Sequence, residues 1–173
     1  MLKKVRVHIV TDRKELKGSL FQTPTGQYLP TGDGEVKEEK EHLELTMEGR
    51  CLDDGARFSV TYKESELTGM EGATTSLSFL KNEPGLITMT RTGTMRTALV
   101  FEAGRRHLCV YETPLSPFEV SVHTKKVTNH LLQDGTLTLD YAVELRGANA
   151  EQTHFSLSLL PFYDKPQGAE NAL

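Results

Sequence analysis

The chain of 173 residues has no tryptophan, only two cysteines and no long apolar run. Near the N-terminus the apolar stretch VHIV is far shorter than the roughly 7 to 15 residues of a signal-peptide core. No segment approaches the roughly 18 apolar residues of a membrane span. Cys51 and Cys109 are too few for a disulfide scaffold, and neither lies in a CxxC motif. We therefore expect a cytoplasmic protein, without a membrane anchor, whose thiols are reduced.

The chain also lacks a large excess of either sign of charge. The formal net charge is -4, and lysine and arginine are scattered among glutamates. The chain therefore has no broad basic field for a phosphate backbone, and we expect no nucleic-acid partner.

Signatures of catalysis and of cofactor binding are missing as well. The sequence contains no glycine-rich phosphate loop, no GxSxG and no HExxH. His107, Cys109 and His123 share the outward parity of neighbouring predicted strands, but they lack the spacing of a zinc site. We expect no enzyme activity, no catalytic residues, no cofactor and no metal.

An alternation of apolar and polar residues dominates from residue 41 onward. LELTM, FSVTY and TLTLDYAVEL are typical of strands that bury one face. Turn signals such as DDG, NEPG and QDG separate these runs. The pattern predicts ten strands, at 4–11, 41–52, 56–65, 73–81, 85–91, 95–102, 106–113, 118–130, 136–146 and 152–160.

Ten short-linked antiparallel strands expose unpaired backbone at both edges unless they close into a barrel or a tight sandwich. We favour an all-β, up-and-down barrel. A chain of this length forms one domain, predicted over 1–163. Residues 12–40 are interpreted as an insertion between the first two strands that could act as a lid, and 164–173 as a disordered tail.

Several segments, in this order and spacing, resemble the YwiB-like family of small bacterial proteins of unknown function. They are TTSLSF, TMTRTG, LVFEAGRRH, YETP, FEVSVHTKK and LTLDYAVEL, and they span about Glu41 to Leu160. The resemblance implies a calycin-like β-barrel, the architecture of lipocalins, in a bacterial cytoplasm, and it implies no reaction or ligand. Leu115, Ser116 and Pro117 stand where the family would have a glycine turn.

Parity along the strands predicts which charges point into the barrel. Arg91 follows Ile87 and Met89, Glu64 follows Phe58, Val60 and Tyr62, and Glu112 follows Leu108 and Val110. All three charges are predicted at one rim, because alternate strands of a meander run the same way. Arg96 is predicted to face outward.

Two interpretations of Arg91 remain open. In the first, Arg91 forms a structural ion pair with Glu64 or Glu112 inside a filled barrel. In the second, Arg91 binds the carboxylate or phosphate of a small apolar or amphipathic ligand near Glu64, Glu112, Tyr62 and Met89. A cavity of roughly 300 Å³ or more that reaches Arg91 would favour the ligand.

A further interpretation is a protein-interaction barrel that uses an outer apolar patch, for which Leu86, Cys109 and Tyr111 are the candidates. The sequence leaves the oligomeric state open.

Overall fold

The computed structural model describes residues 1–17, 20–22, 28–30, 37–68, 70–145 and 148–161. Within them lie twelve strands and one short 3₁₀ helix, η1, at Glu66–Thr68. The strands are β1 Leu2–Lys17, β2 Leu20–Gln22, β3 Tyr28–Pro30, β4 Lys37–Asp53, β5 Arg57–Lys63, β6 Thr74–Leu80, β7 Glu83–Thr92, β8 Arg96–Glu102, β9 Arg106–Glu112, β10 Phe118–His130, β11 Thr136–Leu145 and β12 Ala148–Pro161. No helix in these ranges is long and apolar enough to cross a membrane.

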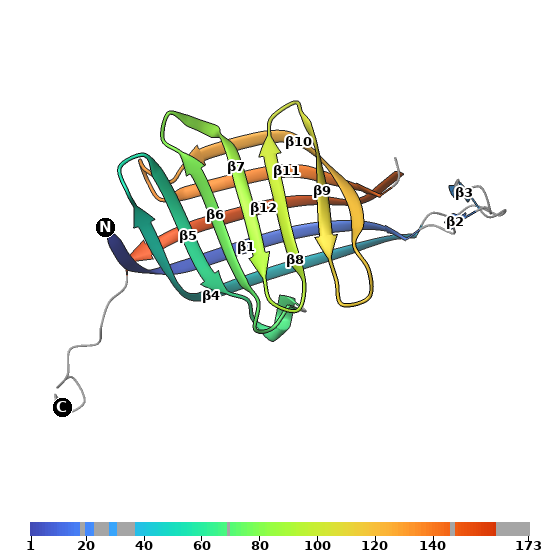
Figure 1. Cartoon of the computed structure of the whole chain (residues 1–173), viewed down its shortest axis with the longest axis horizontal. Helices are drawn as coiled ribbons and strands as arrows, with labels where there is room; N and C mark the ends of the chain where they lie inside the picture. Colours follow the sequence, from blue (N-terminus) through green and yellow to red (C-terminus); the bar gives the residue numbers. More distant parts are fainter. Residues whose placement is uncertain (18–19, 23–27, 31–36, 69, 146–147, 162–173) are drawn as a thin grey trace.

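Ten of the strands form one closed antiparallel barrel, in the order β1-β12-β11-β10-β9-β8-β7-β6-β5-β4 (Figure 1). From β4 to β12 each strand pairs with the next one in sequence. Closure comes from β1, which pairs with β12 on one side and with β4 on the other. The predicted up-and-down barrel of ten strands is confirmed, and closure removes the unpaired edges that an open sheet would expose.

The first and second barrel strands are longer than the sequence pattern predicted. β1 continues to Lys17 and β4 begins at Lys37, and the two strands pair along this whole length. β12 also pairs with β1 as far as Glu15, so β1 remains part of the barrel up to this residue. Residues 12–17 and 37–40 are thus strand rather than insertion. Beyond them, β2 and β3 pair as a small hairpin. The rest of the proposed lid, and the predicted tail at 164–173, lie outside the described residues.

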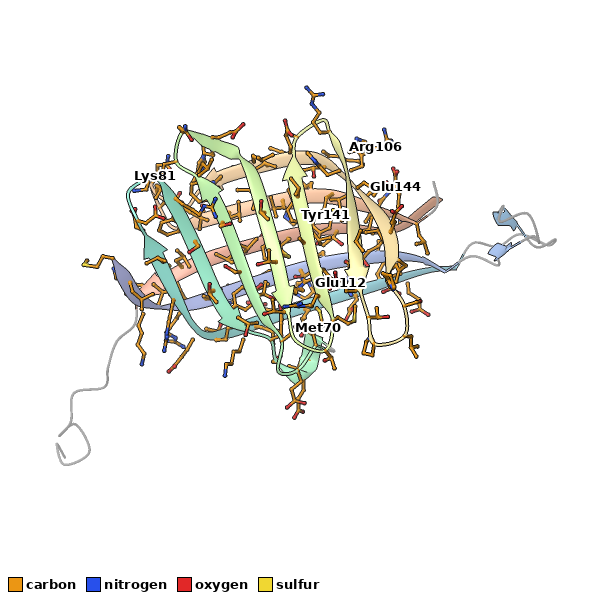
Figure 2. The ribbon with its side chains drawn as sticks, viewed as in Figure 1. Met70, Lys81, Arg106, Glu112, Tyr141 and Glu144 are labelled. Carbon is orange, nitrogen blue, oxygen red and sulfur yellow. The ribbon has the colours of Figure 1, made fainter. Side chains whose placement is uncertain are left out.

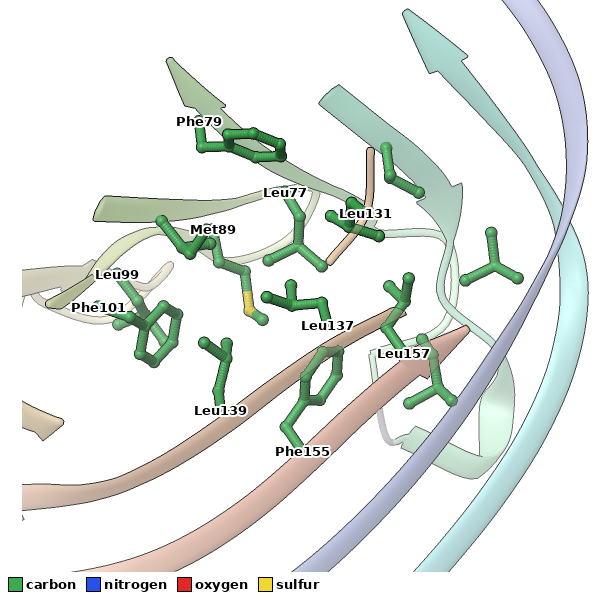
Figure 3. Packing of buried hydrophobic residues seen from close by; sticks show 14 of the residues in the cluster. Leu77, Phe79, Met89, Leu99, Phe101, Leu131, Leu137, Leu139, Phe155 and Leu157 are labelled. Carbon is green, nitrogen blue, oxygen red and sulfur yellow. The ribbon is translucent and has the colours of Figure 1, made fainter. Parts of the chain in front are cut away.

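The barrel interior is filled along most of its length by alternating apolar side chains. In β5, for example, Phe58, Val60 and Tyr62 are buried and their neighbours are not. Leucine, phenylalanine and methionine side chains from facing strands meet in the centre (Figure 3). The largest fully buried members include Leu77, Ile87, Met89, Leu99, Phe101, Leu137, Leu139 and Leu157. The inward prediction for Met89 is confirmed.

The predicted parity of β9 is wrong. Cys109 is buried, whereas Leu108 and Val110 are 69% and 45% exposed, so Glu112 also faces outward. The reason is the pairing with β8, where Thr97 lies opposite Tyr111. Residues directly opposite each other share a face, so the inward face of β8 forces the odd-numbered residues of β9 inward.

Candidate functional site

The two arginines that enter the barrel lie in two cross-strand rows near the end where β5 and β7 finish. In the first row, neighbouring strands place Tyr62, Thr75, Arg91, Thr97 and Tyr111 opposite one another in turn. In the second, pairing aligns Thr124, Tyr141, Thr153, Arg13 and Glu41. Each row follows from inward parity on several strands at one level. We call the two rows together the polar layer.

Arg91 is paired with Glu64, as one interpretation of the sequence predicted. Its Nε lies 3.8 Å from Glu64 Oε1, and the two side chains are 16% and 4% exposed. The same carboxylate oxygen accepts a hydrogen bond of 2.6 Å from the Thr75 hydroxyl. Glu64 is therefore well held by Thr75, whereas its contact with the guanidinium is loose.

Glu112 takes no part in this cluster. It lies opposite Arg96 on the outer face of β8 and β9, and both residues are exposed. The outward prediction for Arg96 is thereby confirmed, and the prediction that Glu112 joins Arg91 inside the barrel is wrong.

A second arginine, which the sequence pattern did not single out, makes a matching arrangement. Arg13 Nε lies 3.2 Å from Glu151 Oε1, and Arg13 Nη1 lies 3.7 Å from Glu41 Oε2. Glu151 Oε1 accepts a hydrogen bond of 2.8 Å from Thr153. The alternation of inward and outward residues, continued beyond the predicted strand ends, could have identified Arg13 and Glu151. Arg13 extends the series Val5, Val7, Ile9 and Thr11, and Glu151 precedes Thr153 by two.

Among the described residues, four buried side-chain atoms lack a hydrogen-bond partner. They are Arg13 Nε, Arg91 Nε, Thr97 Oγ1 and Thr124 Oγ1, and all four belong to the polar layer. Both arginines make ion-pair contacts, but these leave each Nε without a hydrogen-bond acceptor. A buried donor without an acceptor costs about 1–3 kcal/mol, so a concentration of four such atoms points to water or a polar ligand group at this level.

Burial keeps the tyrosines of the polar layer in the neutral form. It raises the pKa of Tyr141 to about 12, although Arg91 nearby acts in the opposite direction. Burial also raises the pKa of Tyr62 and of Tyr111. The phenols are thus hydroxyl groups at neutral pH, and they do not supply negative charge to balance the arginines.

Arg13 and Arg91 line a pocket that is open at this end of the barrel, which we call the rim pocket. Glu41, Glu64, Tyr62 and Tyr141 also line it. The opposite wall is apolar and is formed largely by Leu43, Leu45 and Met47 of β4, with Met70 of the β5–β6 link. These four side chains are only partly buried. The pocket therefore has one charged wall and one apolar wall.

The rim pocket is small. Its volume is about 50 Å³, which holds a few waters or one small headgroup. This is below the roughly 300 Å³ of a typical ligand cavity, and the barrel beneath it is filled. Of the five residues predicted for the ligand site, Tyr62, Glu64 and Arg91 line this pocket, Met89 lies in the core and Glu112 lies outside.

His107, Cys109 and His123, which share parity in the sequence, do not come together as a metal site. Cys109 is buried on the inner side, and His107 Nε2 contacts Glu102 Oε2 at 3.0 Å. In the described part of the chain, no group of three or more histidine, cysteine or acidic residues could hold a metal ion. Cys109 and Tyr111 also leave the set of predicted outer apolar residues, since both face inward.

Comparison with known proteins agrees with this fold. Residues 31–157 match the model of a family described as a domain of unknown function, DUF1934. The crystal structure of the ywiB protein from Bacillus subtilis superposes with a TM-score of 0.67 at 12% identity, covering 94% of each chain. None of the curated proteins matches the sequence significantly. The predicted resemblance is confirmed, and the chain belongs to this YwiB-like family of unknown function.

Proposed function

We propose that this protein is a non-enzymatic, cytoplasmic binding protein for a small amphipathic molecule, and that its headgroup enters the rim pocket. The observation that carries the proposal is the set of unpartnered polar atoms in the polar layer. Two of them belong to arginines that line the pocket. A headgroup with hydrogen-bond acceptors would supply the partners that the protein itself leaves out.

The balance of charges around the rim pocket restricts the kind of headgroup that can bind there. The guanidinium groups of Arg13 and Arg91 lie beside three carboxylates, those of Glu41, Glu64 and Glu151, so negative charges outnumber positive ones by one. An entering anion gains donors but meets no net positive field. A single carboxylate therefore fits better than a doubly charged phosphate, because each extra negative charge is repelled by the three glutamates.

The walls of the pocket indicate where the apolar part lies. The barrel centre is filled, so a tail has no room there. Leu43, Leu45, Met47 and Met70 instead offer a partly exposed apolar wall at the pocket mouth. A tail along this wall removes apolar surface from water and stabilises the complex by about 25 cal/mol per Å² buried.

Decanoate and decanol test this proposal, since they share a tail and differ in the headgroup. We expect decanoate to raise the melting temperature and to bind by calorimetry, and decanol to do neither to a comparable extent. Arg91→Lys keeps the charge but removes the planar fork of donors, so it should weaken decanoate binding about tenfold. Arg50→Ala, on the exposed face of β4, is the matched control. Equal effects of the two probes, or unchanged affinity in Arg91→Lys, would contradict the proposal.

A filled structural or protein-interaction barrel is the second candidate. It is favoured by the filled core and by the ion pair of Arg91 with Glu64. Native mass spectrometry of protein purified from its own cells separates the two candidates. A co-purifying small molecule that is absent from Arg91→Ala supports binding. An empty protein whose Arg91→Ala variant is only less stable supports the structural role.

A further inference from the structure

The outer face of β8 and β9 carries an exposed apolar patch with charged residues at its ends. Its outward residues are Arg96, Ala98, Val100 and Glu102 of β8 and Arg106, Leu108, Val110 and Glu112 of β9. We call this surface the β8–β9 face. It contains two of the exposed large apolar side chains of the described chain, Leu108 and Val110. Neighbouring exposed apolar residues with a charged border are typical of a protein-binding surface.

Charged residues border the apolar centre at both ends of the face. At one end Arg96 of β8 lies directly opposite Glu112 of β9. Glu102 and Arg106 lie towards the other end, but both have partners within the chain: Glu102 Oε2 lies 3.0 Å from His107 Nε2, and Arg106 Nε lies 3.3 Å from Glu144 Oε2. Arg106 and Glu112 lie towards opposite ends of β9 in Figure 2. Arg96 and Glu112 are therefore the charges that this face can offer to a partner.

The face is also hollowed beside its protruding side chains. A depression of about 550 Å³ is lined by Ala98, Val100, Leu108 and Val110, among others. Regular pairing within the described strands β8 and β9 covers only Arg96 with Glu112 and Thr97 with Tyr111. The β8 side has the smaller outward side chains, whereas Leu108 and Val110 project from β9.

We propose that the β8–β9 face binds the same face of a second copy of this chain, forming a two-fold symmetric dimer. A rotation about an axis parallel to the strands lays β8 of one copy over β9 of the other. Leu108 and Val110 then pack on Val100 and Ala98 and fill the depression. Arg96 of each copy meets Glu112 of the other, so opposite charges face each other at both of these symmetry-related corners. The face is self-complementary, as an isologous interface requires.

A two-fold axis that lies in the plane of the interface but runs across the strands fits less well. An axis across the strands places Arg96 on Glu102, which already contacts His107, and it places Leu108 on Val110 and Ala98 on Val100. Large side chains would then meet large ones, and the hollow at Ala98 would stay empty, which loses packing contacts. We therefore assign the axis parallel to the strands. An interface of two strands per copy is at the small end of specific interfaces, so the dimer should dissociate in the range of tens of micromolar.

Sedimentation velocity of the full chain tests the dimer. Over about 1 to 500 μM, a range that brackets this affinity, the mean mass should rise from monomer towards dimer. Leu108→Glu places a charge in the apolar centre and should weaken association at least tenfold. Leu115→Glu changes a leucine that is also exposed but lies in the β9–β10 link, so it should associate like the wild type. A wild type that stays monomeric, or a Leu108→Glu variant that associates normally, would overturn the proposal.

A charge exchange tests the assigned axis. Arg96→Glu and Glu112→Arg each place like charges at two corners of the dimer, so each variant alone should associate at least tenfold more weakly than the wild type. In an equimolar mixture the two altered positions face each other with opposite charges, and association should return. Circular dichroism confirms that both variants are folded. A mixture that associates no better than its components refutes this arrangement.

Discussion

Removing the guanidinium group of Arg91 should destabilise the barrel, because it leaves the Glu64 carboxylate buried without a cation. Breaking a buried ion pair by removing one partner typically costs about 3–5 kcal/mol. The contact here is 3.8 Å long, and Arg91 keeps 16% of its side chain exposed. Both features weaken the pair, so we expect a loss of about 2–3 kcal/mol for Arg91→Met. For a domain of this size, the melting temperature should fall by about 5–10 °C.

The companion variants separate charge from packing. Glu64→Gln keeps an acceptor for the Thr75 hydroxyl and leaves Arg91 partly in contact with solvent, so it should cost about 1 kcal/mol. In the double variant Arg91→Met/Glu64→Gln, the uncompensated carboxylate is gone. The double variant should therefore be more stable than the sum of the two single effects implies, by about 1–2 kcal/mol.

Urea unfolding followed by circular dichroism measures these free energies. Arg96→Met is the matched control, since that arginine faces outward and its loss should change stability by less than about 0.5 kcal/mol. If Arg91→Met costs no more than this control, or if the two single effects add without coupling, the ion pair does not contribute to the stability of the barrel.

Three further predictions concern packing and titration. Gly49→Ala should lower the free energy of unfolding in urea by about 1–3 kcal/mol, because the new Cβ would lie 2.5 Å from the buried Val7 side chain. Gly85→Ala has open space around its Cβ and should be nearly neutral. Equal effects of the two substitutions would contradict this packing. Between about pH 10 and 12, the free energy of unfolding should fall as pH rises, because the unfolded chain loses the Tyr141 proton while the folded chain keeps it. This fall should be smaller in Tyr141→Phe, and an equal fall in both proteins would refute the reasoning. A hydrogen bond to Asp12 raises the pKa of His42. Any stability that this pair contributes is therefore present at acidic pH and is lost as pH rises through the folded-state pKa of His42. An NMR titration should show a higher His42 pKa in the wild type than in Asp12→Asn.

Local alternation determined most of the fold. The strands at 56–65, 73–81 and 118–130 were predicted nearly as they occur, because one buried face and one exposed face give a period of two whatever the partner strand is. The inward positions of Tyr62, Glu64, Met89 and Arg91 followed from the same parity.

β9 shows where local pattern is insufficient. In RHLCVYE both alternating sets contain apolar side chains, so Leu108 and Val110 seemed as fit for the core as Cys109 and Tyr111. Which set faces inward is decided by the pairing of β9 with β8, and the local sequence of β9 does not encode this pairing. The same pairing places Glu112 on the outer face, away from the predicted site.

The sequence by itself determined a barrel of alternating strands and an arginine inside it. Only the tertiary structure decided what surrounds that arginine. Arg13 and Glu151 are far apart in the chain, and they reach the polar layer because β1 and β12 pair beyond the predicted strand ends. Side-chain parity is local, but which strands close the barrel, and at what register, depends on contacts between the two ends of the chain.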